Sequence, residues 1–246
     1  MISERLHSKP QRRALGEWAV ETLYEQIFTG QLSAGADMGE ELLSERLEVS
    51  RATVAFALRQ LELDGVIEVA SGNGRRQVAT FATGDVADLY NVRLALESFT
   101  AAQAALRIAP ESIEKLVRLQ DEMEALSPWS DRPSTRDFGV DFDLHRIIAR
   151  ESGSPRAVTA LQPIWNQTHA LLRHLHSISV YADAIEDAAS YRDHRAIIAA
   201  LARHDAEGSR CAMVEHLTIR RESLIAALER RGGLVQPELS RFNKQD

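Results

Sequence analysis

The feature that most constrains the fold is a run of helical patterns that fills the second half of the chain. From Asp85 to about Arg231, apolar residues recur at helical spacing and no strand pattern appears. Pro110, Pro128, Pro133 and Pro155 fall at the boundaries between the expected helices, where a residue without a backbone N–H is tolerated. The expected helices span residues 85–108, 110–126, 134–152, 154–176, 180–203 and 205–231. With only 13 Gly and 7 Pro in 246 residues, the protein should be mostly α, and this half an all-α antiparallel helical bundle.

The first 80 residues have a different order of elements. Helices over 14–29, 39–46 and 51–65 precede two short strands, VIEVA and QVATF, which flank the turn SGNGRR. Ser50 is a good N-cap for the third helix, and Gly65 can end it. This order predicts a winged helix-turn-helix domain with a small β-hairpin wing. An ordinary three-helix packing motif with a surface hairpin would give the same pattern.

The chain thus divides into five segments. They are a flexible N-terminal arm over 1–13, the winged helix-turn-helix domain over 14–80, a linker over 81–84, the helical domain over 85–231 and a flexible tail over 232–246. The arm is too charged for a signal peptide, and no apolar run is long enough to span a bilayer, so we expect a cytoplasmic protein with no membrane partner. The single Cys211 excludes a disulfide framework within the chain and fits a reducing compartment.

Net charge limits how such a chain can bind DNA. The formal net charge is −7, and residues 1–80 contain 9 Lys+Arg against 12 Asp+Glu, so any contact with DNA must come from a local basic patch. The exposed first turn of the third helix can enter the major groove, with its backbone N–H groups toward phosphate. Arg75 and Arg76 lie at the hairpin tip beside two glycines, where they suit a neighbouring phosphate or the minor groove.

Candidate metal ligands occur on three of the expected helices. In DFDLH, Asp141 and His145 are four residues apart and leave the same face of a helix. His194 and His216 each share a face with apolar residues of their own helices, so all three imidazoles should point toward a common interior. One Asp and three neutral imidazoles suit Zn, Ni or Mn, with positions left open for water or a ligand. His169 can face the same cavity and is a candidate for ligand contact.

The alternative is that these histidines are merely buried. A single inward histidine is more often a satisfied core residue than a metal ligand. Three of them, with a carboxylate one turn from one imidazole, favour the metal site, because such groups are rarely tolerated in a core unless they are paired or metal-bound.

Several segments resemble a known family. The stretch YEQIFTGQLSAGADMGEELLSERLEVSRATVAFALRQLELDGVIEV resembles the DNA-binding domain of GntR-family bacterial transcription regulators. The helical half resembles the FCD effector-binding domain of the FadR-like branch, through LYNVRLALES, DFDLH, DHRAIIAAL and His216. The 22-residue spacing from His194 to His216 fits the metal-binding version of that domain. The resemblance covers residues 15 to 230, and the ordered combination of motifs carries it.

The resemblance implies roles for particular residues. It implies that the aspartate and the three histidines above hold one divalent metal ion, and that Arg93 pairs with the carboxylate of an organic-acid effector. A salt bridge with a residue such as Glu97, its i+4 neighbour, is the alternative for Arg93. Ser50, Arg51 and Thr53 match positions that touch DNA in such regulators.

The chain also departs from the family pattern in the DNA reader. The family usually has Arg where this chain has Ala55, an acidic residue where it has Phe56, and Thr or Pro where it has Ala52. The loss of a basic contact changes which operator bases are read, and it makes the wing arginines and the arm KPQRR more important for affinity.

Three functions are compatible with these patterns. The first is a ligand-responsive transcription regulator, a homodimer that reads two half-sites of an operator and senses a small carboxylate metabolite at the metal. The second is a metal-dependent hydrolase or lyase, which would leave the N-terminal half unexplained. The third is a helical interaction module without a metal. A winged helix-turn-helix domain followed by a helical bundle with candidate metal ligands favours the first function. The chain is therefore not expected to be an enzyme.

Overall fold

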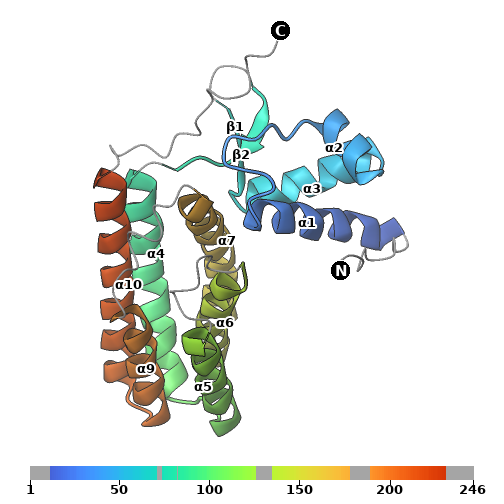
Figure 1. The fold of residues 1–246 in the computed structure, drawn as a ribbon. Coiled ribbons are helices and arrows are strands. Elements are labelled where there is room, and N and C mark those ends of the chain that lie inside the picture. The colour runs from blue at the N-terminus through green and yellow to red at the C-terminus, as the bar shows by residue number, and fades with distance from the viewer. Residues whose placement is uncertain (1–11, 71–73, 82, 126–134, 178–188, 231–246) are drawn as a thin grey trace. The chain divides into compact units, whose positions relative to one another are not determined.

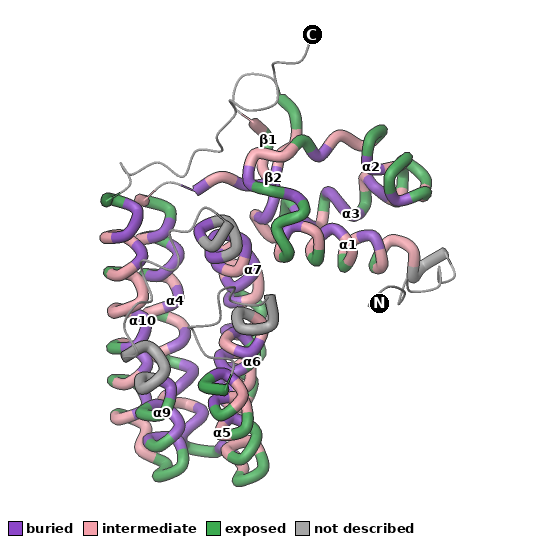
Figure 2. Tube along the Cα trace, in the orientation of Figure 1, coloured by how far each residue is buried: buried purple, intermediate pink, exposed green. Residues whose placement is uncertain are grey.

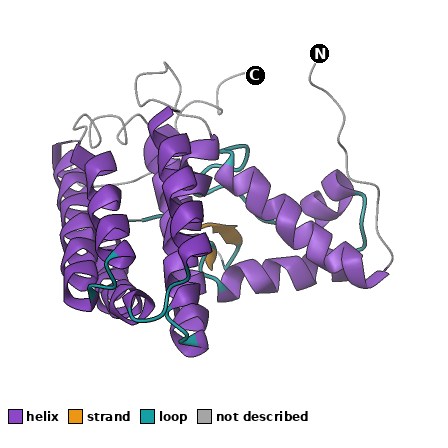
Figure 3. Ribbon diagram, turned by 90° about the horizontal axis from the view of Figure 1, so that it is seen from below, coloured by secondary structure: helices purple, strands orange, loops and turns teal. Residues whose placement is uncertain are grey.

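The structure is a computed structural model, and it describes residues 12–70, 74–81, 83–125, 135–177 and 189–230. The chain folds as two compact units that meet in sequence between Ala79 and Thr80, and each is described here by itself. The described residues are mostly helical, with one β-hairpin, as predicted (Figures 1 and 3). Most of the predicted arm and all of the predicted tail lie outside the described residues.

The N-terminal unit is built around α3. Its elements are α1 (Arg12–Phe28), α2 (Glu40–Leu47), α3 (Arg51–Leu63), β1 (Ile67–Val69) and β2 (Arg76–Val78). Helix α3 packs against α1, α2 and β1, and its residues Val54, Leu58 and Leu61 are fully buried. This arrangement confirms the predicted winged helix-turn-helix.

The ends of α3 follow from local chemistry. Ser50 has an extended backbone and its hydroxyl accepts a hydrogen bond from the Thr53 N–H at 3.2 Å, which confirms the predicted N-cap. After the C-cap Asp64, Gly65 adopts a φ of +66°, a left-handed conformation that favours glycine and stops the helix.

The hairpin is shorter than predicted and has an additional partner. Its strands pair antiparallel with Ile67 opposite Val78, and the segment before α2 adds to the free edge of β2. Gly35 N–H donates to Val78 O and Met38 N–H to Arg76 O, both at 2.9 Å. This pairing brings the loop before α2, with its acidic side chains, beside the wing.

The helical unit confirms the predicted all-α bundle. Its described helices are α4 (Thr83–Ala105), α5 (Pro110–Ala125), α6 (Thr135–Glu151), α7 (Pro155–Ser177), α9 (Ala189–Ala202) and α10 (Ala206–Arg230). Helix α4 packs against α6, α7, α9 and α10, and Figure 2 shows buried residues along its whole length. The helix predicted over 180–203 begins in a stretch outside the described residues. Among the helices that are described, none combines the length and the apolar character needed to cross a membrane.

Candidate functional site

Three helices bring one aspartate and three histidines to a single point inside the helical unit. Asp141 and His145 come from α6, His194 from α9 and His216 from α10. One ligand atom of each residue lies within 4.8 Å of the ligand atoms of the others. The ring centroids of His194 and His216 are 4.3 Å apart, and that of His145 lies 5.2 Å from His216. The four residues grouped from sequence are therefore neighbours in space.

The geometry and burial of these groups fit a divalent metal ion. Asp141 Oδ1 and His194 Nε2 are 3.4 Å apart. Two ligands bonded at about 2.1 Å to a tetrahedral ion would be separated by about the same distance. The three histidines are buried. The buried atoms without a hydrogen-bond partner among the described residues include Asp141 Oδ1, both ring nitrogens of His145 and of His194, and His216 Nδ1. Buried polar atoms without partners are costly, and an ion at this point would satisfy several of them.

The electrostatics of the cluster favour the protonation state that metal ligands need. Burial lowers the pKa of His194 to about 3, against the attraction of Asp141. Burial, and then His194, hold the pKa of His216 well below its ordinary value. Burial alone would raise the pKa of Asp141, but His194 and His145 outweigh it and the pKa is lowered. At neutral pH the site therefore presents the Asp141 carboxylate and the neutral imidazoles of His194 and His216, which have free lone pairs.

Glu97 on α4 is a central residue of the site, which the sequence indicated only as the alternative salt-bridge partner of Arg93. Its Oε1 accepts hydrogen bonds from Arg93 Nε at 2.5 Å and from Trp165 Nε1 at 3.1 Å, and its Oε2 lies 2.6 Å from His145 Nδ1. Burial alone would raise the pKa of Glu97, but Arg93 and then His145 lower it to about 2, so the carboxyl is ionised. The available signal was its position one turn after Arg93 on a helix rich in apolar residues.

Arg93 makes the salt bridge with Glu97 and still keeps donor capacity. Only 2% of the residue is exposed, and the guanidinium carbon lies 5.1 Å from the Tyr90 ring centroid and 5.7 Å from that of Phe142. Burial would lower the pKa of Arg93, but Glu97 raises it, so the group stays charged. Its buried Nη2 has no hydrogen-bond partner in the described part of the chain. The ring of His169 stacks on the ring of Phe142, and the two ring centroids are 5.0 Å apart.

A second arginine, Arg220, acts on the same site and was not predicted. It lies one turn after His216 on α10. Burial raises the pKa of Tyr90 and the charge of Arg220 opposes this rise, while the same charge adds to the lowering of the pKa of Asp141 by His194 and of the pKa of His216 by burial. The four-residue spacing from His216 would have indicated it. The buried Arg93 and the half-buried Arg220 therefore both place positive charge near the cluster.

The residues predicted to contact DNA lie on the N-terminal unit. Ser50 and Thr53 form the cap of α3, and their hydroxyl oxygens are 2.8 Å apart. Arg51, on the first turn of α3, forms an ion pair with Glu41 of α2. About two thirds of the Arg51 side chain remains exposed, which leaves it open to solvent and to a partner.

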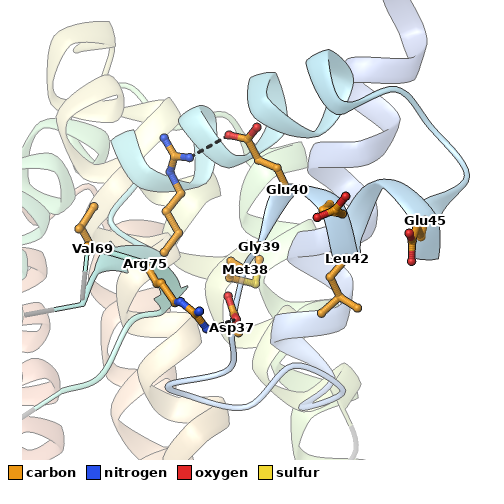
Figure 4. Close-up of a pocket in the computed structure, with 11 residues that line it drawn as sticks. Asp37, Met38, Gly39, Glu40, Leu42, Glu45, Val69 and Arg75 are labelled. Atoms are coloured by element: carbon orange, nitrogen blue, oxygen red, sulfur yellow. Dashed lines mark hydrogen bonds and ion pairs between the residues drawn. The ribbon is translucent and has the colours of Figure 1, made fainter. Parts of the chain in front are cut away.

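The two wing arginines are also paired with carboxylates. Arg75 Nη1 lies 3.5 Å from Asp37 Oδ2. Arg76 makes two ion pairs, from Nη1 to Glu40 Oε1 and from Nε to Glu62 Oε2, each at 3.1 Å. These residues, Glu62 excepted, line an open groove of about 690 Å³ between the wing and the start of α2 (Figure 4). Exposed pairs of this kind are worth at most about 1 kcal/mol, so a phosphate can replace the carboxylate.

One departure from the family pattern has a visible structural partner. Phe56 on α3 is 55% exposed, and its ring lies against α1, where a Cβ at Gly16 would come within 2.9 Å of it. The aromatic residue thus occupies the space that the glycine leaves on α1.

Comparison with known proteins decides the family. Residues 15–76 match the bacterial regulatory proteins of the gntR family, and residues 88–218 match the FCD domain. The chain belongs to the GntR family and carries its FCD domain. This GntR chain is 25% identical to the Exu regulon transcriptional regulator of Escherichia coli over 228 residues, or 83% of this chain and 82% of the relative. It is 29% identical to the Uxu operon transcriptional regulator of the same species over 193 residues, or 72% and 74%.

Solved structures agree on the fold of this GntR protein. McbR/YncC of Escherichia coli superposes with a TM-score of 0.72 at 20% identity, over 89% of this chain and 99% of that one. A GntR transcriptional regulator from a Rhodococcus species gives a TM-score of 0.71 at 21% identity, over 87% and 99%. The GntR protein is a transcriptional regulator with an effector-binding domain, and this removes the metal-dependent hydrolase or lyase from consideration.

Proposed function

We propose that this GntR protein is a homodimeric regulator that binds operator DNA and senses a small carboxylate metabolite at a divalent metal ion. The observation that carries the proposal is the convergence of Asp141, His145, His194 and His216 within 4.8 Å of one another inside the FCD domain. Zn, Ni and Mn all suit one carboxylate and three imidazoles.

The chemistry of the site suits an organic acid. A metal bound by these four residues would act as a Lewis acid toward carboxylate oxygens at its open positions. Arg93 Nη2 would receive a second oxygen of the same ligand, and His169, whose ring stacks on the Phe142 ring that Arg93 also contacts, would be a further ligand contact. A buried anion needs compensating charge, and Arg93 and Arg220 supply it.

Binding to DNA would use Ser50, Arg51 and Thr53 on α3 and the two wing arginines. Phosphates that replace the carboxylate partners of Arg51, Arg75 and Arg76 would supply the affinity for DNA. The negative net charge of this unit does not supply it. Two such heads in one dimer would read two half-sites of a near-palindromic operator.

The surface of α4 supports self-association. Phe99 is 47% exposed and Leu106 is 60% exposed. Phe99 lies on α4, and Leu106 directly follows Ala105, the last residue of this helix. Exposed large apolar side chains toward this end of α4 suit the same surface of a second copy. We expect the dimer to have two arrangements that differ in the spacing of its two DNA-binding units. An effector that binds one arrangement more tightly than the other would then alter that spacing.

Fluorescence anisotropy on the DNA upstream of the gene itself tests the proposal. We expect saturable binding that exceeds binding to a scrambled duplex, and a response to carboxylates that requires added Zn²⁺, Ni²⁺ or Mn²⁺. Binding without sequence preference at moderate salt contradicts the regulator. Protein purified without an affinity tag gives the second measurement: a metal content near zero that added ions do not restore favours the metal-free helical module.

A further inference from the structure

We propose that Glu97 is the positioning residue of the metal site, because it fixes the ring orientation and tautomer of His145. The inference rests on the metal site of the proposed function. It concerns a residue that would not touch the ion, and it follows from contacts that three helices make with one carboxylate.

The first step concerns how Glu97 itself is held. Oε1 receives the Nε–H of Arg93 from its own helix, α4, and the indole N–H of Trp165 from α7. All three side chains are buried. Two donors on one oxygen leave the plane of the carboxylate little freedom, so the direction of Oε2 is set by one donor from α4 and one from α7.

The second step concerns the proton of His145. Oε2 lies 2.6 Å from Nδ1 of His145 on α6. An ionised carboxylate can only accept, so Nδ1 must carry the hydrogen of the neutral ring. Nε2 then has the free lone pair, and it is buried without a hydrogen-bond partner within the described residues. Nδ1 and Oε2 are close enough to share a proton, although their alignment in the structure falls short of a hydrogen bond. A carboxylate behind a histidine ligand fixes its tautomer and raises its basicity in many metal sites.

The third step concerns what glutamine would do at this position. The side-chain oxygen of Gln can still accept from Arg93 and Trp165, which puts its NH₂ group where Oε2 now lies. An NH₂ group donates, so it would favour a lone pair on Nδ1 and a proton on Nε2 of His145. The proton would then occupy the nitrogen that the ion needs. The change alters no volume and removes no ligand.

The experiment compares full-length wild type, Glu97→Gln and Glu124→Gln, all stripped of metal. Glu124 is the matched control, because its carboxylate also joins two helices, α5 and α9, through Arg195 at 2.7–2.8 Å, and both side chains of this pair are exposed instead of lying in the buried cluster. Zn²⁺ affinity is measured by competition with a chromophoric chelator. We expect Glu97→Gln to weaken Zn²⁺ roughly 10- to 100-fold, the usual effect of losing such a partner, and Glu124→Gln to leave it unchanged.

A second readout separates positioning from a general loss of packing. The ¹⁵N chemical shifts of the His145 ring in the metal-free proteins should report the Nδ1–H tautomer in wild type and the Nε2–H tautomer in Glu97→Gln. If both proteins show the same tautomer and the same Zn²⁺ affinity, the proposal is overturned while the metal site stands. If wild type binds none of Zn²⁺, Ni²⁺ and Mn²⁺, the metal site and this inference fall together.

A milder variant decides the matter if Glu97→Gln does not fold. Trp165→Phe keeps an aromatic ring but removes one of the two donors that hold Oε1. A net hydrogen bond is worth roughly 0.5–1.5 kcal/mol, so Zn²⁺ should bind about two- to tenfold more weakly. An unchanged affinity in folded Trp165→Phe contradicts the positioning role.

Discussion

Replacing His194 by alanine should remove most of the thermal stabilisation that a metal ion gives this protein. His194 is fully buried, and both of its ring nitrogens lack hydrogen-bond partners among the residues described. In the metal-free protein two effects of the substitution oppose each other. Loss of the ring leaves a cavity that costs about 2–5 kcal/mol, while removal of an unsatisfied buried polar group recovers about 1–3 kcal/mol. The metal-free variant should therefore be only modestly less stable than wild type.

The difference becomes large when metal is present. At a Zn²⁺ concentration 100 times the wild-type Kd, binding stabilises the folded state by about 2.7 kcal/mol. If loss of one of four ligands weakens binding about 100-fold, the variant gains only about 0.4 kcal/mol at the same concentration. For a unit of this size 1 kcal/mol corresponds to about 2–4 °C, so the Zn²⁺-induced shift in Tm should fall by about 5–9 °C.

Circular dichroism melts of both proteins, with and without Zn²⁺, measure this shift. His204→Asn is the control, because His204 lies outside the cluster, with Nδ1 2.7 Å from Ala105 O, and has a φ of +54° that asparagine tolerates. It should retain the full shift. A His194→Ala variant that also retains the full shift refutes the assignment of this ligand.

Three further predictions follow from the contacts and charges described. Glu41→Gln releases Arg51 and removes a carboxylate beside the DNA surface, so operator affinity in an anisotropy titration should rise by up to about fivefold; lower affinity would contradict the exchange of carboxylate for phosphate. Arg76→Ala should weaken binding to specific and scrambled DNA alike and reduce the slope of log K against log[salt] by about 0.9, and an unchanged slope would exclude a phosphate contact. Burial lowers the pKa of His194 to about 3 and also lowers that of His216, whereas both histidines have the ordinary pKa of 6.5 in the unfolded chain. Below pH 6.5 the unfolded chain therefore binds more protons than the folded protein. The metal-free protein should therefore lose up to about 1.4 kcal/mol of unfolding free energy per pH unit and per histidine as pH falls from about 6.5 toward 3, and urea titrations at pH 7 and pH 5 that agree would disprove it.

Local signals explain which parts of the fold could be predicted. The N-cap at Ser50 and the helix end at Gly65 each depend on a few consecutive residues. In the bundle, α5 begins at Pro110 and α7 at Pro155, where the sequence predicted helix boundaries. The convergence of the histidines also followed from local pattern, because His194 and His216 lie on the apolar faces of their helices. A face that is apolar apart from one imidazole must turn that imidazole inward with the rest.

The contacts that depend on tertiary pairing could not be predicted in the same way. Glu97 owes its role to Trp165 on α7 and His145 on α6, and nothing in the spacing of α4 specifies those partners. The pairing of Arg75 with Asp37 depends on the segment 35–38 joining the edge of β2, a contact between residues some 40 positions apart. Sequence spacing predicts which face a residue occupies, and long-range packing decides what it meets there.

The placement of the four ligands on α6, α9 and α10 has one more consequence under the proposed function. His194 follows His145 by 49 residues and precedes His216 by 22, so a bound ion would close two long loops of the chain and act as a removable cross-link. A cell short of the metal would then hold a looser sensor, more open to proteases between α6 and α9, before any metabolite arrived. The regulator would respond to metal supply as well as to its organic acid.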